Sequence, residues 1–242
     1  NEMKIIKHIP NTITSMNLLC GVMGVILTFQ GALDLAFYLM IAAAVFDFMD
    51  GFAARMLKAY SAMGKELDSL ADLISFGLLP SLMIYRRLVE GGMTGFWTYI
   101  PVIICIFSAL RLAKFNVDER QSENFLGLPT PACAMWCGSL IYAADRGVMT
   151  IAGLLNERSI MLVAPVILAA LLVCEIPMFS FKFKKGSEYN RIRFCFIGVI
   201  AASAIAILAL KINWSYIILL TFTAYIVLNL IRALFSIRFN RK

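Results

Sequence analysis

The sequence predicts an all-α integral membrane protein, a polytopic bundle of about eight transmembrane helices. Three values support this prediction: 61% of the 242 residues are hydrophobic, only 15% are charged, and the mean hydropathy is +0.82. Soluble domains are about half apolar and about one quarter charged, and disordered chains are poor in apolar residues, so both classes are excluded. A bilayer-spanning helix takes roughly 20 residues, so this length holds at most about eight to ten spans and we expect no separate soluble domain.

Charged residues divide the chain into eight apolar segments of suitable length. In chain order, the predicted spans are residues 12–30, 34–55, 66–85, 95–114, 131–150, 159–179, 193–210 and 214–235. The first, fourth and eighth have uncharged apolar centres, whereas the second and third carry aspartates. The fifth begins at Pro131, which together with Pro129 ends one helix and starts the next. The sixth follows Arg158, and the seventh begins at Arg193.

Lys and Arg residues are distributed unevenly between the two membrane faces that these spans define. Of the 22 residues, 17 lie on the side of both termini and the other 5 on the opposite side. Basic loops face the cytoplasm, so we expect both termini to be cytoplasmic. We also expect the membrane to be that of a prokaryotic cell. The same rule explains the net charge of +7 without a nucleic-acid partner. The six cysteines lie in or beside apolar runs, which indicates neither a disulfide framework nor a zinc site.

Four aspartates, Asp47, Asp50, Asp68 and Asp72, lie in the cytoplasmic third of the second and third spans. A membrane-embedded aspartate costs about 2.5 to 3.5 kcal/mol at a helix centre and less near the interface. At about 100° per residue each pair shares one helix face, and a hinge at Gly64 would let the two faces meet. Four converging carboxylates repel one another, so cations must separate them. Oxygen ligands select Mg²⁺, Mn²⁺ or Ca²⁺, and four carboxylates can hold two such ions.

Small and basic residues accompany the aspartates. Gly51 and Ala54 lie near the face of Asp47 and let a flat group approach the helix, while Arg55 and Lys65 can pair with phosphate oxygens. Together these features predict a diphosphate site at the cytoplasmic membrane surface. The alternative is that the four acids pair with Lys and Arg for packing alone.

The same residues form an ordered motif. From Asp47 to Asp72 the sequence reads D-x2-D-G-x2-A-R-x8-G-x3-D-x3-D, with eight fixed positions in 26 residues. This motif resembles the signature of the CDP-alcohol phosphotransferase family. Residues 10–18, 72–77, 111–116 and 127–131 further resemble the membrane-embedded phosphatidylserine synthases within that family.

The resemblance implies the CDP-alcohol phosphotransferase fold and transfer of the phosphatidyl group of CDP-diacylglycerol to L-serine, with release of CMP. The four aspartates would hold two divalent cations, Mg²⁺ or Mn²⁺ with Ca²⁺ as a further option, and Asp72 would deprotonate the acceptor hydroxyl. We expect a single transmembrane domain over residues 1–242, with a catalytic six-helix core in 1–180 and two additional helices in 181–242. The family also implies a homodimer surrounded by membrane lipids.

Candidate contacts to the two substrates complete these expectations. Those to CDP-diacylglycerol are Thr14, Asn17, Gly51, Ala54, Arg55, Ser61 and Gly64. Those to the acceptor are Ser75, Arg111, Asn116 and Thr130. The single histidine, His8, lies near the N-terminus and is not expected to be catalytic.

Three other functions stay open at the level of the sequence. Other family members use glycerol 3-phosphate, inositol phosphate, choline or ethanolamine as the acceptor, and a phosphorylated acceptor would demand an extra cationic pocket. A membrane prenyltransferase also grips a diphosphate with aspartates and Mg²⁺, but typically has two acidic motifs in separate halves of the chain. A divalent-cation transporter favours broken helices, repeated halves and acids at the midplane, and this sequence has none of these features.

Overall fold

The chain is almost entirely helical in the computed structural model, which describes residues 8–118, 125–146, 157–179, 189–209, 211 and 213–239. In chain order, the elements are α2 (His8–Phe29), α3 (Leu33–Met56), α4 (Ala62–Asp72), the π-helix η1 (Leu73–Leu78), α5 (Leu79–Glu90), the 3₁₀-helix η2 (Phe96–Tyr99), α6 (Val102–Val117), β1 (Phe125–Leu126), α7 (Thr130–Asp145), α8 (Glu157–Val173), β2 (Pro177–Met178), α9 (Tyr189–Ala209) and α10 (Ser215–Phe239).

The helices correspond to the predicted spans. α4, η1 and α5 follow one another without a break and form one segment, which we call the third span, and η2 leads into α6. The described residues therefore form eight helical segments, each overlapping one predicted span. Five segments are long and apolar enough to cross a membrane: His8–Phe29, Leu33–Met56, Ala62–Glu90, Phe96–Val117 and Ser215–Leu234. The prediction of an all-α integral membrane protein is confirmed.

Some local predictions were wrong. The turn after α3 does not hinge at Gly64, because Ser61 caps α4 and places Gly64 in the first turn of that helix; the turn instead contains Lys58 with φ 49°. α8 ends at Val173 rather than at residue 179, because Pro177–Met178 pair antiparallel with β1. Residues 147–150 of the fifth predicted span lie outside the described residues.

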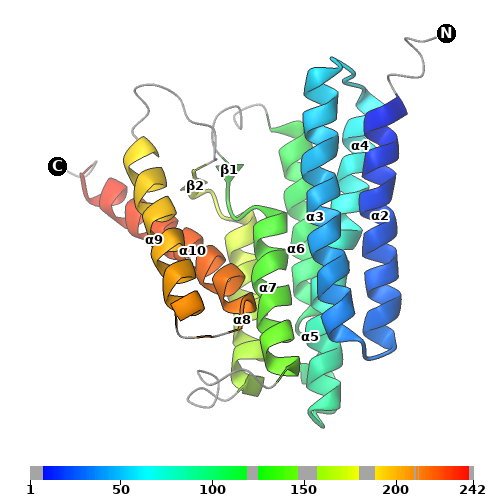
Figure 1. Cartoon of the computed structure of the whole chain (residues 1–242), viewed down its shortest axis with the longest axis vertical. Helices are drawn as coiled ribbons and strands as arrows, with labels where there is room; N and C mark the ends of the chain where they lie inside the picture. Colours follow the sequence, from blue (N-terminus) through cyan, green and yellow to red (C-terminus); the bar gives the residue numbers. More distant parts are fainter. Residues whose placement is uncertain are drawn as a thin grey trace.

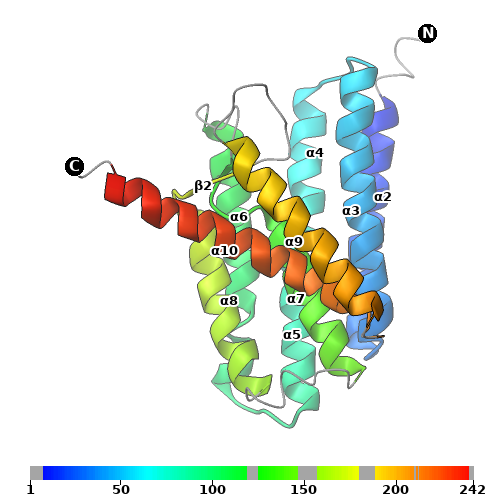
Figure 2. The ribbon, with the colours of Figure 1, turned by 60° about the vertical axis from the view of Figure 1, so that its left-hand side comes forward.

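The bundle has α7 near its centre. Figure 1 shows α2, α3 and the third span side by side, with α9 and α10 on the opposite flank. In Figure 2, α10 crosses the other helices obliquely, and it packs on α7 and α9. Almost every residue of α7 from Thr130 to Ala144 is buried, and its Ala, Cys, Gly and Ser side chains let neighbouring helices approach closely. The C-terminal end of α3 and the start of α4 therefore lie at one end of a tightly packed bundle, the upper end in Figure 1.

α2 packs closely against the third span at η1. Three consecutive residues of this π-helix, Ser75, Phe76 and Gly77, are buried. Ser75 faces Gly21 of α2, where a methyl group would lie 2.3 Å from Ser75 Oγ and 3.0 Å from Ser75 Cα. Because the second of these atoms is backbone, rotating a side chain cannot relieve the overlap.

Gly21→Ala is therefore expected to lower the free energy of unfolding by about 1–3 kcal/mol, the usual cost of overpacking a close contact. Thermal unfolding of the detergent-solubilised protein measures this effect as a lower midpoint. The matched control is Gly198→Ala in α9, where an added methyl group meets no atom within 4 Å. Equal midpoints for the two variants would contradict the close approach of α2 to η1.

Candidate active site

The four aspartates of the motif meet at one end of the bundle. Asp47 and Asp50 come from the C-terminal part of α3, and Asp68 and Asp72 come from α4. One carboxylate oxygen each of Asp47, Asp50 and Asp68 lies within 4.8 Å of the other two. Asp72 is buried and lines one cavity together with the other three. The spacing of three and four residues places each pair on one helix face, and the turn between α3 and α4 brings the faces together.

α2 holds two of these carboxylates by hydrogen bonds. Thr14 Oγ1 donates to Asp50 Oδ2 at 2.6 Å, and Asn17 Nδ2 donates to Asp72 Oδ1 at 3.3 Å. Asn17 is fully buried, so it supports Asp72 from behind rather than facing a cavity. Sequence reasoning missed both hydrogen bonds. The available signal was the three-residue spacing of Thr14 and Asn17, which puts both on one face of α2.

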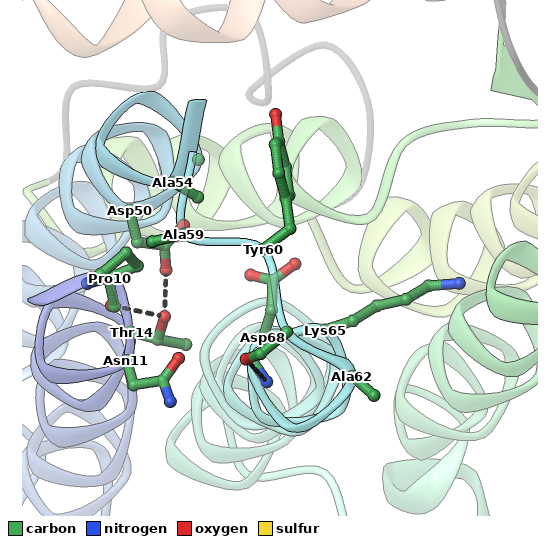
Figure 3. Close-up of a pocket in the computed structure, with 13 residues that line it drawn as sticks. Pro10, Asn11, Thr14, Asp50, Ala54, Ala59, Tyr60, Ala62, Lys65 and Asp68 are labelled. Carbon is green, nitrogen blue, oxygen red and sulfur yellow. Dashed lines mark hydrogen bonds between the residues drawn. The ribbon is translucent and has the colours of Figure 1, made fainter. Parts of the chain in front are cut away.

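The carboxylate cluster fits a hard cation. Ligand oxygens at about 2.0–2.6 Å from a shared ion lie no more than about 5 Å apart, which agrees with the 4.8 Å cluster. Asp68 Oδ1 is buried and has no hydrogen-bond partner among the described residues, and an unsatisfied buried oxygen is costly without a ligand. Lys65 extends away from the acids in Figure 3, and its Nζ donates to the backbone oxygen of Asn116 at 2.8 Å. This position of Lys65 disfavours the alternative in which the acids pair with basic residues for packing.

A cavity of about 570 Å³, the α2 cavity, lies between α2, α3 and the start of α4 (Figure 3). Its walls include five of the predicted contacts to CDP-diacylglycerol: Thr14, Gly51, Ala54, Ser61 and Gly64. A methyl group at Gly51 would meet only Arg55 Nη1, at 3.8 Å, so this part of α3 presents bare backbone to the cavity. Ser61 Oγ accepts a hydrogen bond from the Gly64 backbone nitrogen at 2.9 Å, which fixes the first turn of α4.

A second cavity of about 450 Å³, the α6 cavity, lies on the other side of the carboxylates. All four aspartates line it, together with Arg55, Lys65, Ser69, Arg111, Asn116, Pro129 and Pro131, among others. Arg111 of α6 is buried, and its Nη1 donates to Thr130 Oγ1 at 2.8 Å. Asn116 Nδ2 donates to Ser69 Oγ at 2.9 Å. The wall facing the carboxylates thus carries a guanidinium group and an amide.

The predicted acceptor contacts separate into two groups. Arg111 and Asn116 lie on the wall of the α6 cavity. Thr130 is fully buried behind Arg111, and Ser75 is fully buried in η1, where its Oγ donates to the backbone oxygen of Asn17 at 3.1 Å. The structure therefore places Thr130 and Ser75 in supporting positions behind the cavity wall.

The two cavities share part of their walls. Asp50, Gly51, Lys65 and Asp68 line both of them. A group in the α2 cavity and a different group in the α6 cavity would therefore face the same carboxylates from two sides. This arrangement suits a reaction between two substrates at one cation-binding centre.

Comparison with known proteins identifies the family of the chain. Residues 7–174 match the family model described as CDP-alcohol phosphatidyltransferase. Archaetidylserine synthase of Methanothermobacter thermautotrophicus is 30% identical over 170 residues, which cover 69% of this chain and 72% of that protein. CDP-diacylglycerol–serine O-phosphatidyltransferases of Bacillus subtilis and Helicobacter pylori are 36% and 35% identical over 129 residues. These matches cover 53% and 52% of this chain, and 72% and 54% of the respective relatives.

Proposed function

The chain belongs to the CDP-alcohol phosphatidyltransferase family, and from this membership we propose that it transfers the phosphatidyl group of CDP-diacylglycerol to L-serine. The family resemblance of the motif is thereby confirmed. Besides family membership, one structural observation supports a reaction between two substrates: two cavities with different walls meet at the same aspartates, Asp50 and Asp68. Relatives named CDP-diacylglycerol–serine O-phosphatidyltransferase in two bacteria, and a relative named archaetidylserine synthase, support serine as the acceptor.

We assign the cytidine of the donor to the α2 cavity, with the diphosphate at the carboxylates that both cavities share. Gly51 and Ala54 leave room for a flat base against α3, and Ser61 and Gly64 shape the opposite wall. Arg55 lies on the wall of the adjoining α6 cavity, where its guanidinium group suits the diphosphate. This assignment keeps the lipid-linked phosphorus next to the shared carboxylates.

The four aspartates would hold two divalent cations, with Mg²⁺ or Mn²⁺ as the first candidates and Ca²⁺ as a further one. When bound, such cations neutralise the diphosphate and stabilise the charge that develops on CMP. Asp72 accepts the proton of the serine hydroxyl, while the hydrogen bond from Asn17 fixes its other oxygen. The serine oxygen forms a bond to the phosphatidyl phosphorus as the bond to the bridging oxygen breaks, and CMP leaves with that oxygen. No covalent enzyme intermediate is required.

The α6 cavity would receive the acceptor. Arg111 is placed to bind the serine carboxylate, and Thr130 holds the guanidinium group from behind. Asn116 offers amide atoms on the same wall. Ser75 contributes indirectly, because its Oγ donates a hydrogen bond to the backbone oxygen of Asn17 and the Asn17 side chain donates to Asp72.

The extent of the catalytic core, the orientation in the membrane and the oligomeric state are proposed as well. The family match ends at residue 174, directly after α8, which supports a catalytic six-helix core in residues 1–180 with α9 and α10 as additions. In Figure 1, α2 begins and α10 ends in the upper half of the bundle, where α4 also lies, which supports a cytoplasmic site with both termini on that side. The homodimer stays a prediction.

Purified protein is expected to release CMP from CDP-diacylglycerol when L-serine and Mn²⁺ or Mg²⁺ are present. Chelation with EDTA should lower this rate at least about hundredfold, because a catalytic cation supplies several kcal/mol of transition-state stabilisation, and either cation should restore it. Glycerol 3-phosphate, inositol phosphate and choline serve as competing acceptors in the same assay. CMP release that no acceptor alcohol stimulates, or that a different alcohol stimulates more than L-serine, would contradict the proposed function.

A further inference from the structure

We propose that Tyr225 and Asn229 of α10 are positioning residues for the acceptor side of the site. They act through the segment of residues 174–179, which we call the strap, on the chain corner of residues 127–131 that supports Arg111. The inference rests on the proposed function, since it assigns α10 a part in serine binding. α10 lies outside the residues matched by the family model, so the support comes from a part of the chain that the motif does not include.

α10 holds the strap by hydrogen bonds to both backbone groups of Phe179. Tyr225 Oη donates to the Phe179 backbone oxygen at 3.0 Å, and the Phe179 nitrogen donates to Asn229 Oδ1 at 3.0 Å. Asn229 Nδ2 in turn donates to the Tyr225 backbone oxygen at 2.8 Å. Tyr225 is 3% exposed and Asn229 is fully buried, so water does not replace these bonds. Figure 2 shows α10 passing β2, the strand within the strap.

The strap in turn holds the corner that precedes α7. β2 pairs antiparallel with β1, with Leu126 opposite Pro177, and the Gly127 nitrogen donates to the Ile176 oxygen at 3.0 Å. Gly127 has φ +78°, and a methyl group there would lie 2.6 Å from the Leu172 oxygen. The Leu128 nitrogen also donates to the Leu171 oxygen at 2.8 Å, so the corner is held on one side by the end of α8 and on the other by the strap. Loosening the strap removes one of these two supports.

The corner forms part of the α6 cavity. Pro129 and Pro131 line this cavity, and Thr130 between them accepts the hydrogen bond from Arg111 Nη1. A second contact joins the strap to α6 itself, because Lys114 Nζ lies 3.0 Å from Glu175 Oε1. The path from α10 to the cavity thus runs through backbone hydrogen bonds to the residue that holds the proposed carboxylate-binding guanidinium group.

The α2 cavity lies outside this path. Its lining residues belong to α2, α3, the turn after α3 and the start of α4, and none of them contacts α10 or the strap in the hydrogen bonds described above. Loosening the grip of α10 on the strap should therefore weaken binding of the acceptor and spare binding of CDP-diacylglycerol. A general loss of packing would affect both substrates alike.

Tyr225→Phe tests the proposal with the least disturbance, because it removes one hydroxyl and keeps the ring that packs against Phe179 at 4.9 Å between centroids. The matched control is Thr223→Val, which removes a different hydrogen bond of α10, the one that Thr223 Oγ1 accepts from Trp136 Nε1 of α7 at 2.9 Å. The steady-state assay uses the full chain in detergent with Mn²⁺, CDP-diacylglycerol and L-serine. We expect Tyr225→Phe to raise KM for L-serine about threefold to tenfold, the effect of losing one buried hydrogen bond, with kcat and KM for CDP-diacylglycerol unchanged. Thr223→Val should change neither KM.

Asn229→Ala provides the second variant, and thermal unfolding midpoints are recorded for all three. An unchanged KM for L-serine in Tyr225→Phe would overturn the proposal, as would equal changes in both KM values or the same change in Thr223→Val. If Tyr225→Phe does not fold, the KM for L-serine of Asn229→Ala decides by the same criteria, and failure of both to fold would assign the two residues to the core alone. The proposed function is tested separately by serine-dependent CMP release from the unaltered protein.

Discussion

Asp72→Asn is expected to lower turnover by about 10²- to 10⁴-fold, the range for loss of a positioned general base. Asparagine has the same shape as aspartate, so the buried position and the neighbouring amide of Asn17 can accommodate it. The α2 cavity, which Asp72 does not line, should keep its ability to bind the nucleotide. The measurement pairs the rate of CMP release with binding of CDP-diacylglycerol by calorimetry or by protection against thermal unfolding.

The control for this variant is Asp34→Asn at the opposite end of α3. Asp34 forms an ion pair with Arg146 and lies far along the helix from the aspartate cluster. We expect Asp34→Asn to retain the turnover of the unaltered protein. Full activity in Asp72→Asn would show that another group removes the proton, and the proposed role of Asp72 would be wrong.

Asp68→Ala should abolish the cation site. Asp68 is one of the three residues whose oxygens cluster within 4.8 Å, and its Oδ1 is the buried oxygen without a hydrogen-bond partner among the described residues. Removing a direct ligand should reduce Mn²⁺ affinity at least about hundredfold, since loss of an outer-shell partner alone costs 10- to 100-fold. Electron paramagnetic resonance of free Mn²⁺ measures this affinity without any turnover.

Glu66→Ala is the matched control for the metal measurement. Glu66 belongs to the same helix, is exposed, and is not among the residues that line either cavity. Its removal subtracts one negative charge without touching the cluster, so Mn²⁺ affinity should stay at the parent value. Equal Mn²⁺ affinities for Asp68→Ala and the parent would place the cation elsewhere.

Much of the aspartate cluster was predictable because it depends on local geometry. The spacings of Asp47 to Asp50 and of Asp68 to Asp72 fix a shared face on each helix, whatever the rest of the chain does. Helix–helix contacts were less predictable, because they depend on which residues distant in sequence pack together. The bonds from α2 to Asp50 and Asp72 are of this kind, and so is the buried position of Ser75 against Gly21.

The connections at the end of the bundle that holds the aspartates were predicted least well. The two-residue strands β1 and β2 carry no period that a sequence could reveal, and they shorten the sixth helix relative to its apolar run. The position of Gly64 was predicted wrongly for a different reason: the Ser61 cap three residues earlier starts α4 and takes Gly64 into the first turn of that helix. Arg111 could be named from the sequence, but its support by Thr130 and the corner before α7 could not.

The π-helix η1 lies between two parts of the third span that have different roles: α4 carries Asp68 and Asp72, and α5 packs into the core. A regular α-helix is a rigid rod, so rotating one half about the axis would rotate the other by the same amount. Because a turn of the π-helix η1 is wider than a turn of an α-helix, the half with Asp68 and Asp72 is rotated about the helix axis relative to α5. The side chains of α5 can therefore face the core while the carboxylates of Asp68 and Asp72 face the α6 cavity.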